Sequence, residues 1–192
     1  MKTYIKNTLG SFFLISFIIL LSTGCNKDND DNTGNANFNV FLKSTLSKEK
    51  ASAAFEEVNI DIQKVYVHTS TDSAATTGWF ELETTSGVID LLKDSAEKDT
   101  LLAFDSVMQV QTISQIRLVL GNANSVVKDG QSHDLETPSG QTSGIKVQVH
   151  AELEAKKSYK VRLDFDVYES ILETGNGKFK MKPVIEATVI EE

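Results

Sequence analysis

The sequence predicts an all-β protein, built as an antiparallel β-sandwich or barrel with at most one short helix. Apolar residues recur mostly at period two after residue 37, which is the spacing of a strand with one buried face. The apolar runs follow one another about every 8–12 residues, with turn residues between them. No part of the sequence offers the helices that alternate with strands in a βαβ fold.

The composition fits one folded domain. The chain has 192 residues, of which 40% are hydrophobic and 24% charged, so it is too apolar to be disordered and too short for several domains. Its formal net charge is −8, and every acidic residue follows Cys25. Nucleic acids and anionic membrane surfaces both attract clustered Lys and Arg, so this charge argues against either as a partner.

Residues 1–24 have the pattern of a secretory signal peptide. Lys2 and Lys6 precede an apolar core at residues 12–21. A transmembrane helix needs about 20 apolar residues, and this core is too short for that but suits a signal peptide. We therefore expect an exported protein that begins after residue 24.

Cys25 is expected to carry a lipid anchor. The sequence LSTGC at residues 21–25 resembles a bacterial lipobox, in which signal peptidase II cleaves before a lipidated cysteine, although Ser22 occupies the usual position of Leu. Cys25 is the only cysteine, so an intramolecular disulfide is impossible. The alternative is a free buried thiol. Bacterial lipoproteins of the kind that this pattern resembles carry several acyl chains, which would hold the protein stably on a membrane.

Residues 25–36 read as a flexible acidic tether, because no apolar residue that could be buried occurs between Cys25 and Ala36. The tether resembles the Lys-then-acidic signal that sends lipoproteins to the cell surface in some Gram-negative lineages. The expected location is therefore the outer membrane, facing the cell exterior; the alternative is a plain linker on a protein that faces the periplasm. A calcium loop would need a turn glycine and a terminal Glu at fixed spacing. The residues that carry the export resemblance are Lys27, Asp28, Asp30 and Asp31.

The β-domain is expected over residues 37–192. Residues 58–62 alternate, and the phase then slips by one before residues 65–67, which predicts a bulge near residues 63–64. Residues 46–55 alone have helical propensity. The later strands are expected at residues 79–82, 88–92, 101–104, 116–120, 145–153, 159–167 and 179–190.

Two hairpin turns are predicted from dipeptides that adopt positive φ. Asp-Gly at residues 129–130 and Asn-Gly at residues 176–177 each suit the two central positions of a type I′ turn. Pairing outward from the second turn places Glu173 opposite Lys180, so that opposite charges meet on one face.

A third hairpin is predicted around a loop at residues 154–158. This register aligns the apolar faces of the two flanking runs. It also places Glu152 opposite Lys160 and Lys146 opposite Asp166, and each such ion pair would contribute about 0.2–1 kcal/mol.

Several segments along the chain are distinctive: VNIDIQKVYVH (58–68), GVIDLL (87–92), QIRLVL (115–120), TPSGQTSG (137–144), LDFD (163–166) and KPV (182–184). In this order they resemble the domain of unknown function 4382 family of bacterial exported lipoproteins, over residues 38–187. The chain departs from the family pattern at residues 42–46, which read LKSTL where such domains often carry LTDAP. The resemblance implies a single antiparallel sandwich, similar to immunoglobulin or transthyretin domains, and brings no established activity.

The histidines do not predict a metal site. His68 follows Val67 and is expected on the outer face, His133 lies just past a turn, and His150 is expected to be solvated. No two of them share the i, i+2 spacing of one strand face, and no cysteine joins them.

No catalytic constellation is present either, so we expect a protein that is not an enzyme and needs no cofactor. The sequence GQTSG at residues 140–144 lacks a nucleophilic serine, because Thr142 occupies its position. Asp164 and Asp166 lie on one face about 7 Å apart by strand rise, but acidic faces are common in so acidic a chain.

The expected function is binding of a glycan or protein ligand. Trp79 and Phe80 are adjacent in a strand, so one faces outward, and Tyr66 and Tyr168 fall on faces opposite their apolar neighbours. Exposed aromatic rings on a sheet can stack on sugars, although a lone Trp is more often part of a core or rim. The alternative is a structural or assembly protein of the cell envelope.

Overall fold

The computed structural model describes residues 34–46, 55–69, 77–94, 96, 98–109, 111–138, 140 and 143–192. The chain divides into two units, residues 1–31 and 32–192, and all the described residues belong to the second. The predicted signal peptide, Cys25, the export residues 27–31 and most of the predicted helical stretch at residues 46–55 lie outside the described residues. Within the described part, no helix combines the length and apolar character needed to cross a bilayer.

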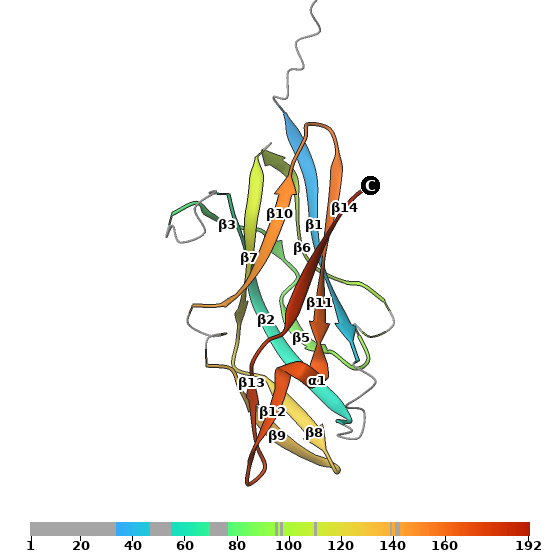
Figure 1. The fold of residues 1–192 in the computed structure, drawn as a ribbon, viewed down its shortest axis with the longest axis vertical. Helices are drawn as coiled ribbons and strands as arrows, with labels where there is room; N and C mark the ends of the chain where they lie inside the picture. The colour runs from blue at the N-terminus through green and yellow to red at the C-terminus, as the bar shows by residue number, and fades with distance from the viewer. Residues whose placement is uncertain are drawn as a thin grey trace, which may run out of the picture. The chain divides into compact units, whose positions relative to one another are not determined.

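The described chain forms strands almost throughout, with one short helix, α1 (Val167–Ser170). The predicted all-β sandwich is confirmed (Figure 1). The strands are β1 Asn35–Thr45, β2 Glu57–His68, β3 Trp79–Glu81, β4 Glu83–Thr84, β5 Gly87–Asp90, β6 Thr100–Gln109, β7 Thr112–Leu120, β8 Ser125–Lys128, β9 Gln131–Glu136, β10 Ile145–Glu152, β11 Ser158–Asp166, β12 Ile171–Gly175, β13 Lys178–Met181 and β14 Ile185–Glu191.

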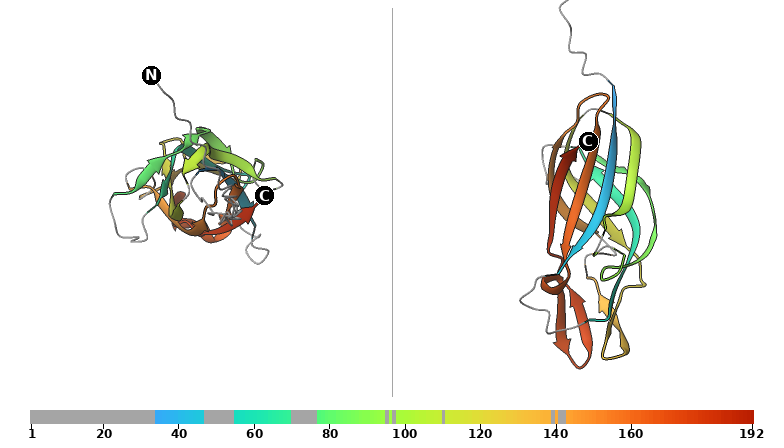
Figure 2. Two further views of the ribbon diagram at one scale, coloured as in Figure 1. Left: turned by 90° about the horizontal axis from the view of Figure 1, so that it is seen from above. Right: turned by 90° about the vertical axis from the view of Figure 1, so that its right-hand side faces the viewer.

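Two sheets make up the sandwich. The first sheet has the order β14-β11-β1-β6-β4, and the second has the order β10-β7-β2-β8-β9-β13-β12, with β3 and β5 also paired to β2. Neighbouring strands are antiparallel except for the parallel pairs β1–β11 and β13–β9. Seen from above, the strands of the two sheets surround a shared interior (Figure 2).

The interior is filled by the alternating apolar residues that the sequence pattern predicts. In β11 every second residue is buried, and Phe165 is 1% exposed. Phe38 and Leu42 of β1 and Ile116 of β7 are also fully buried. Each such side chain stabilises the fold by roughly 1.5–3 kcal/mol relative to an exposed one. The predicted bulge in β2 is confirmed, since the register with β7 shifts between Ile62 and Lys64.

The two predicted turns form, but one predicted register is wrong. Asp129 and Asn176 both have positive φ, as do the glycines that follow them, and each turn joins its two expected strands. In the β12–β13 hairpin, however, Glu173 lies opposite Phe179 rather than Lys180. A regular ladder without a bulge would have placed Glu173 opposite Lys180.

The physical reason for the shifted register is a bulge next to the turn. Thr174 and Gly175 of β12 together stand opposite the single Lys178 of β13. Gly175 has φ of 97°, and a glycine at positive φ is one of the ways in which a strand accommodates an extra residue. Glu173 consequently pairs with Lys128 of β8, with 2.6 Å between Oε2 and Nζ.

The third predicted hairpin is wrong. β10 pairs with β7 in the second sheet, whereas β11 lies between β1 and β14 in the first. The chain between them crosses from one sheet to the other. Strands that face each other across a core bury matching apolar faces just as paired strands do, so the alternation could not tell the two arrangements apart. Lys160 instead places its Nζ 2.6 Å from Asp99 Oδ2, and Asp166 caps α1 by accepting a hydrogen bond from the Glu169 amide.

Two hairpins, β8–β9 and β12–β13, lie together at the lower end of the domain (Figure 1) and are seen there again in the side view (Figure 2). The parallel pair β9–β13 joins them, with Phe179 opposite Leu135. Phe179 also contacts Phe55 and His133, with ring centroids 5.9 and 5.1 Å apart. This aromatic contact attaches the hairpins to the sandwich.

Candidate functional site

The outer face of the second sheet carries a cluster of aromatic and charged side chains on β10, β7, β2 and β3. Strand register sets it up, because residues opposite each other on neighbouring strands share a face. One cross-strand row is Lys146, Arg117, Tyr66 and Glu81, and the next is Gln148, Gln115, His68 and Trp79. We call this cluster the Trp79 face and define it by Tyr66, His68, Trp79, Glu81, Arg117 and Lys146.

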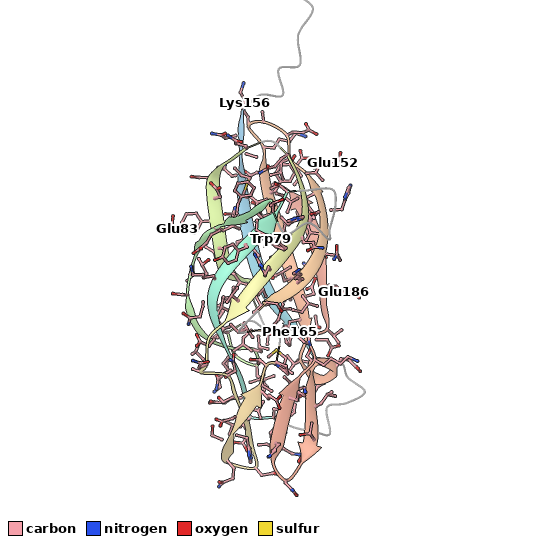
Figure 3. All side chains as sticks on the ribbon, turned by 90° about the vertical axis from the view of Figure 1, so that its left-hand side faces the viewer. Trp79, Glu83, Glu152, Lys156, Phe165 and Glu186 are labelled. Carbon is pink, nitrogen blue, oxygen red and sulfur yellow. The ribbon has the colours of Figure 1, made fainter. Side chains whose placement is uncertain are left out.

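Trp79 extends from β3 across the neighbouring strands. Its ring centroid lies 4.7 Å from that of His68 on β2. The Arg117 guanidinium carbon on β7 is 4.0 Å from the indole centroid, and Lys146 Nζ on β10 is 5.6 Å from it. Both contacts are within the range of cation–π attraction. The indole is half-buried, and Trp79 lies about halfway along the domain (Figure 3).

His68 is buried beneath Trp79. It lies on the predicted face, but the Trp79 ring covers it and its exposed fraction is 0%. Its Nε2 lies 2.9 Å from the Thr77 carbonyl oxygen, and its Nδ1 lies 2.9 Å from Ser114 Oγ. A carbonyl oxygen only accepts, so Nε2 carries the hydrogen. With both ring nitrogens engaged, His68 supports the Trp79 face rather than acting as a base or a metal ligand.

Glu81 is held as an anion beside Tyr66. The Tyr66 hydroxyl donates to Glu81 Oε2 at 2.8 Å, and Lys64 Nζ lies 3.0 Å from the same oxygen. The hydrogen bond from Tyr66, followed by the one from Lys64, lowers the pKa of Glu81 below its ordinary value. The hydrogen bond to Glu81 raises the pKa of Lys64. The charge of Glu81 is therefore already matched by that of Lys64.

Arg117 has no such carboxylate partner among the described residues. Its guanidinium also lies 4.9 Å from the Tyr66 ring centroid, and its Nε is buried without a hydrogen-bond partner in that same part of the chain. Arg162, the other arginine of the chain, instead donates from Nε to both carboxylate oxygens of Asp164 at 2.9 and 3.1 Å. The two arginines thus differ sharply in how their charge is neutralised.

Gly144 fixes the stem of Arg117. Its φ is 73°, and a Cβ at this position would lie 2.6 Å from Arg117 Cγ. The close approach and the positive φ both require glycine here. The segments 58–68, 115–120 and 137–144, which carry the family resemblance, thus each contribute a residue to the Trp79 face or its support.

The structure brings together Trp79 and Tyr66 but not Tyr168. Tyr168 belongs to α1, and its ring stacks on Phe55 with centroids 6.1 Å apart and an interplanar angle of 16°. It is partly buried against the core. Phe80 lies opposite Val67, on the other face of the sheet from Trp79, and is 52% exposed at the sheet margin.

Sequence reasoning missed Arg117, Lys146 and Glu81 as members of this site. Each occupies an outward position of its strand, and that much was readable from the alternation. The signal that would have grouped them is the pairing of β7 with both β2 and β10. This pairing joins residues about 30 to 80 positions apart in the chain, and no local pattern carries it.

Two of the cavities formed by described residues lie away from the Trp79 face. One, of about 310 Å³, is lined mostly by apolar residues, among them Pro138, Leu172 and Met181. The other, of about 290 Å³, contains Asp164, Asp166 and Glu186. Asp164 is paired with Arg162 and Asp166 caps α1. No group of three or more His, Cys, Asp or Glu side chains within the described part of the chain is placed to hold a metal ion.

Neither remaining histidine lies in a polar cluster that would support catalysis. His150 is exposed, and its Nε2 lies 3.5 Å from Glu152 Oε1. His133 packs against Phe179.

The comparisons with known proteins identify a family but no activity. Neither the curated proteins nor the solved structures include a match to this chain. The family described as "Domain of unknown function (DUF4382)" matches residues 42–183, which lie within the range of the resemblance seen in the sequence and cover most of the chain. The chain therefore belongs to the domain of unknown function family DUF4382.

Proposed function

We propose that this protein is a lipid-anchored lipoprotein of the outer membrane that faces the cell exterior. It acts there as a non-catalytic binding module that takes a glycan or protein ligand on the Trp79 face. The anchor would be the lipid on Cys25, and the export signal would be Lys27 with the acidic residues that follow it. A tether ending at the start of β1 would leave the domain free to meet its ligand.

The observation that carries the binding proposal is the position of Trp79. Its half-buried indole extends from β3 toward β2, β7 and β10, with a guanidinium and an ammonium group beside it and a phenol on the neighbouring strand. Aromatic rings offer a flat apolar surface for the C–H face of a sugar, and the surrounding polar groups can hydrogen-bond its hydroxyls. The same combination of Trp, Tyr and Arg is enriched at the centres of protein–protein interfaces.

The engaged polar groups support binding rather than catalysis. A general base needs a free nitrogen or carboxylate oxygen near the ligand. On the Trp79 face, the nitrogens of His68 are both occupied, and the carboxylate of Glu81 is hydrogen-bonded by Tyr66 and Lys64.

Assembly through strand addition is the second candidate. It would need a long edge strand that is open to a partner. β10 and β14 are edge strands of the two sheets, but they contact each other, so each partly covers the free edge of the other. This arrangement favours a ligand on the sheet face over a strand added at the edge.

A glycan array tests the binding proposal. The full lipoprotein in detergent is expected to bind particular glycans, and Trp79→Ala is expected to abolish that binding. Phe80→Ala is the matched control, because Phe80 is the adjacent aromatic residue on the opposite face and is 52% exposed. Equal binding by wild type and Trp79→Ala would reject the Trp79 face as the site.

Protease treatment of intact cells tests the location. We expect the wild-type protein to be cleaved, and a variant with residues 27–31 replaced by Ala and Ser to be protected. Cys25→Ser is expected to release the protein from the membrane fraction. If neither wild type nor variant is cleaved while detergent extracts are digested normally, the protein faces the periplasm and its ligand lies there.

A further inference from the structure

Two cationic side chains lie next to each other on the Trp79 face. Lys146 of β10 and Arg117 of β7 are register partners, so their side chains leave the sheet on the same side. Both approach the same indole, at 4.0 Å for Arg117 Cζ and 5.6 Å for Lys146 Nζ. Two like charges side by side repel each other unless an anion lies between them or above them.

The protein itself supplies no such anion among the described residues. Within that part of the chain, neither Arg117 nor Lys146 has a carboxylate within ion-pair distance, whereas Lys64 pairs with Glu81 and Arg162 pairs with Asp164. Glu81, the acidic member of the face, is bonded to Tyr66 and Lys64. A chain with a formal net charge of −8 thus offers these two cations no carboxylate from its described part.

The geometry also prepares Arg117 to bind a planar anion. Its guanidinium lies against the rings of Trp79 and Tyr66, at 4.0 and 4.9 Å, and Gly144 packs against its stem. Stacking restricts the plane of a guanidinium, which reduces the entropy lost when it binds a carboxylate through two parallel hydrogen bonds. Because Nε is buried, the terminal nitrogens Nη1 and Nη2 are the donors available to a ligand.

We infer that the ligand of the Trp79 face is an acidic glycan, whose sugar carboxylate is bound by Arg117 and Lys146 while a sugar ring contacts Trp79. This inference rests on the proposed binding function and narrows its ligand to uronic or sialic acid polymers. The aromatic ring beside the cations favours a sugar over a simple anion. A nucleic acid would need cations along its whole backbone, and the acidic chain does not offer them.

Trp79 provides the readout, because it is the only tryptophan of the chain. The full lipoprotein in detergent is titrated with polygalacturonate, alginate, hyaluronate and polysialate, and its tryptophan emission is followed. Each polymer is also tested after chemical reduction of its carboxyl groups to alcohols, which keeps the backbone and removes the charge. We expect saturable binding of at least one acidic polymer, weakened about 10-fold or more by carboxyl reduction and by high salt.

Substitutions test which side chains bind the sugar carboxylate. Arg117→Gln and Lys146→Gln are each expected to weaken binding of the acidic polymer, and Arg117→Lys is expected to restore part of it. Arg162→Gln is the control, since Arg162 lies in the first sheet and is expected to leave binding unchanged. Unchanged circular dichroism and thermal unfolding would show that the variants are folded. Because Trp79→Ala removes the only tryptophan, binding by this variant is measured by calorimetry.

The outcomes separate this inference from the proposed function. If acidic and carboxyl-reduced polymers bind equally well and Trp79→Ala abolishes both, binding does not require a sugar carboxylate. This inference would then be rejected, whereas the proposed binding function of the Trp79 face would stand. Binding that survives Arg117→Gln, or no binding of any acidic polymer, would also overturn the inference. If poly-glutamate binds as tightly as the polysaccharides, the inference of a glycan would be wrong, and the ligand would be an acidic protein. Neutral glycans bound on the array would still support the proposed function.

Discussion

Trp79 determines the surroundings of the polar residues near it. The strand pattern places His68 and Tyr66 correctly on the outer face, but their exposure depends on what lies over them. The Trp79 ring covers His68, which is 0% exposed, and the Arg117 guanidinium contacts the rings of both Trp79 and Tyr66. Alternation predicts the direction of a side chain, whereas burial depends on a residue from another strand.

The first prediction concerns Glu81. Hydrogen bonds from Tyr66 and Lys64 hold its pKa below the ordinary 4.5. The folded pKa is thus below the unfolded one, so ionised Glu81 stabilises the fold above pH 4.5, and this contribution is lost as the pH falls through the folded pKa. In Tyr66→Phe the pKa of Glu81 should rise toward 4.5. A carboxyl NMR titration measures it, and Tyr168→Phe should leave it unchanged.

The second prediction compares two glycines with nearly equal φ. Gly130 has φ of 71° and open space where a Cβ would lie, whereas a Cβ on Gly144, with φ of 73°, would lie 2.6 Å from Arg117 Cγ. Gly130→Ala should lose about 1–2 kcal/mol of unfolding free energy from backbone strain. Gly144→Ala should lose about 1–3 kcal/mol more from overpacking. Urea unfolding measures both losses.

Trp79 emission gives an independent check on the glycine pair. It should change in Gly144→Ala, because the displaced Arg117 contacts the indole, and should stay the same in Gly130→Ala. Equal effects of the two substitutions on stability and emission would show that Gly144 does not support the site.

Local sequence patterns predict some features of the strands but not which strands pair. The bulge in β2 and the turns at residues 129–130 and 176–177 follow from local patterns, and all three are present. The predicted pairing of β10 with β11 is absent, although it would have formed two favourable ion pairs. Their alternation fits strands in one sheet and strands in facing sheets equally well, and the actual neighbours are distant in sequence.

The third prediction distinguishes the two arrangements of β11. Lys160 Nζ lies 2.6 Å from Asp99 Oδ2, and both side chains are about four-fifths buried. A double-mutant cycle between these residues, each changed to Ala, should give a coupling energy of about 0.5–1 kcal/mol. The cycle between Lys160 and Glu152 should give none within error. A larger coupling with Glu152 would favour the β10–β11 hairpin instead.

At the scale of the whole molecule, one interior supports both sheets, and its largest side chains come from strands of each. Phe38 of β1 and Phe165 of β11 belong to the same buried core cluster as Ile116 and Leu118 of the second sheet. The Trp79 face is built on the outside of that second sheet, so the rigidity of the core fixes the spacing of its side chains.

The fourth prediction contrasts a buried and an exposed phenylalanine. Phe165 is 1% exposed and Phe80 is 52% exposed. Phe165→Ala should lower the free energy of unfolding by about 3–5 kcal/mol, because it leaves a cavity between the sheets. Phe80→Ala should lower it by less than about 1 kcal/mol. Urea unfolding measures both changes, as shifts of the midpoint at an unchanged m-value. Similar losses of unfolding free energy in the two variants would contradict a shared interior between the two sheets.

The class of fold, the family, the faces of most strands and the positions of the tight turns could all be predicted from the amino-acid sequence. These features rest on period-two alternation and on dipeptides that tolerate positive φ, both of which are local properties of the chain. The identity of neighbouring strands, and with it the position of Arg117 and Lys146 beside Trp79, became known from the folded structure. Strand pairing joins residues far apart in the chain, and its free energy depends on packing that no local pattern records.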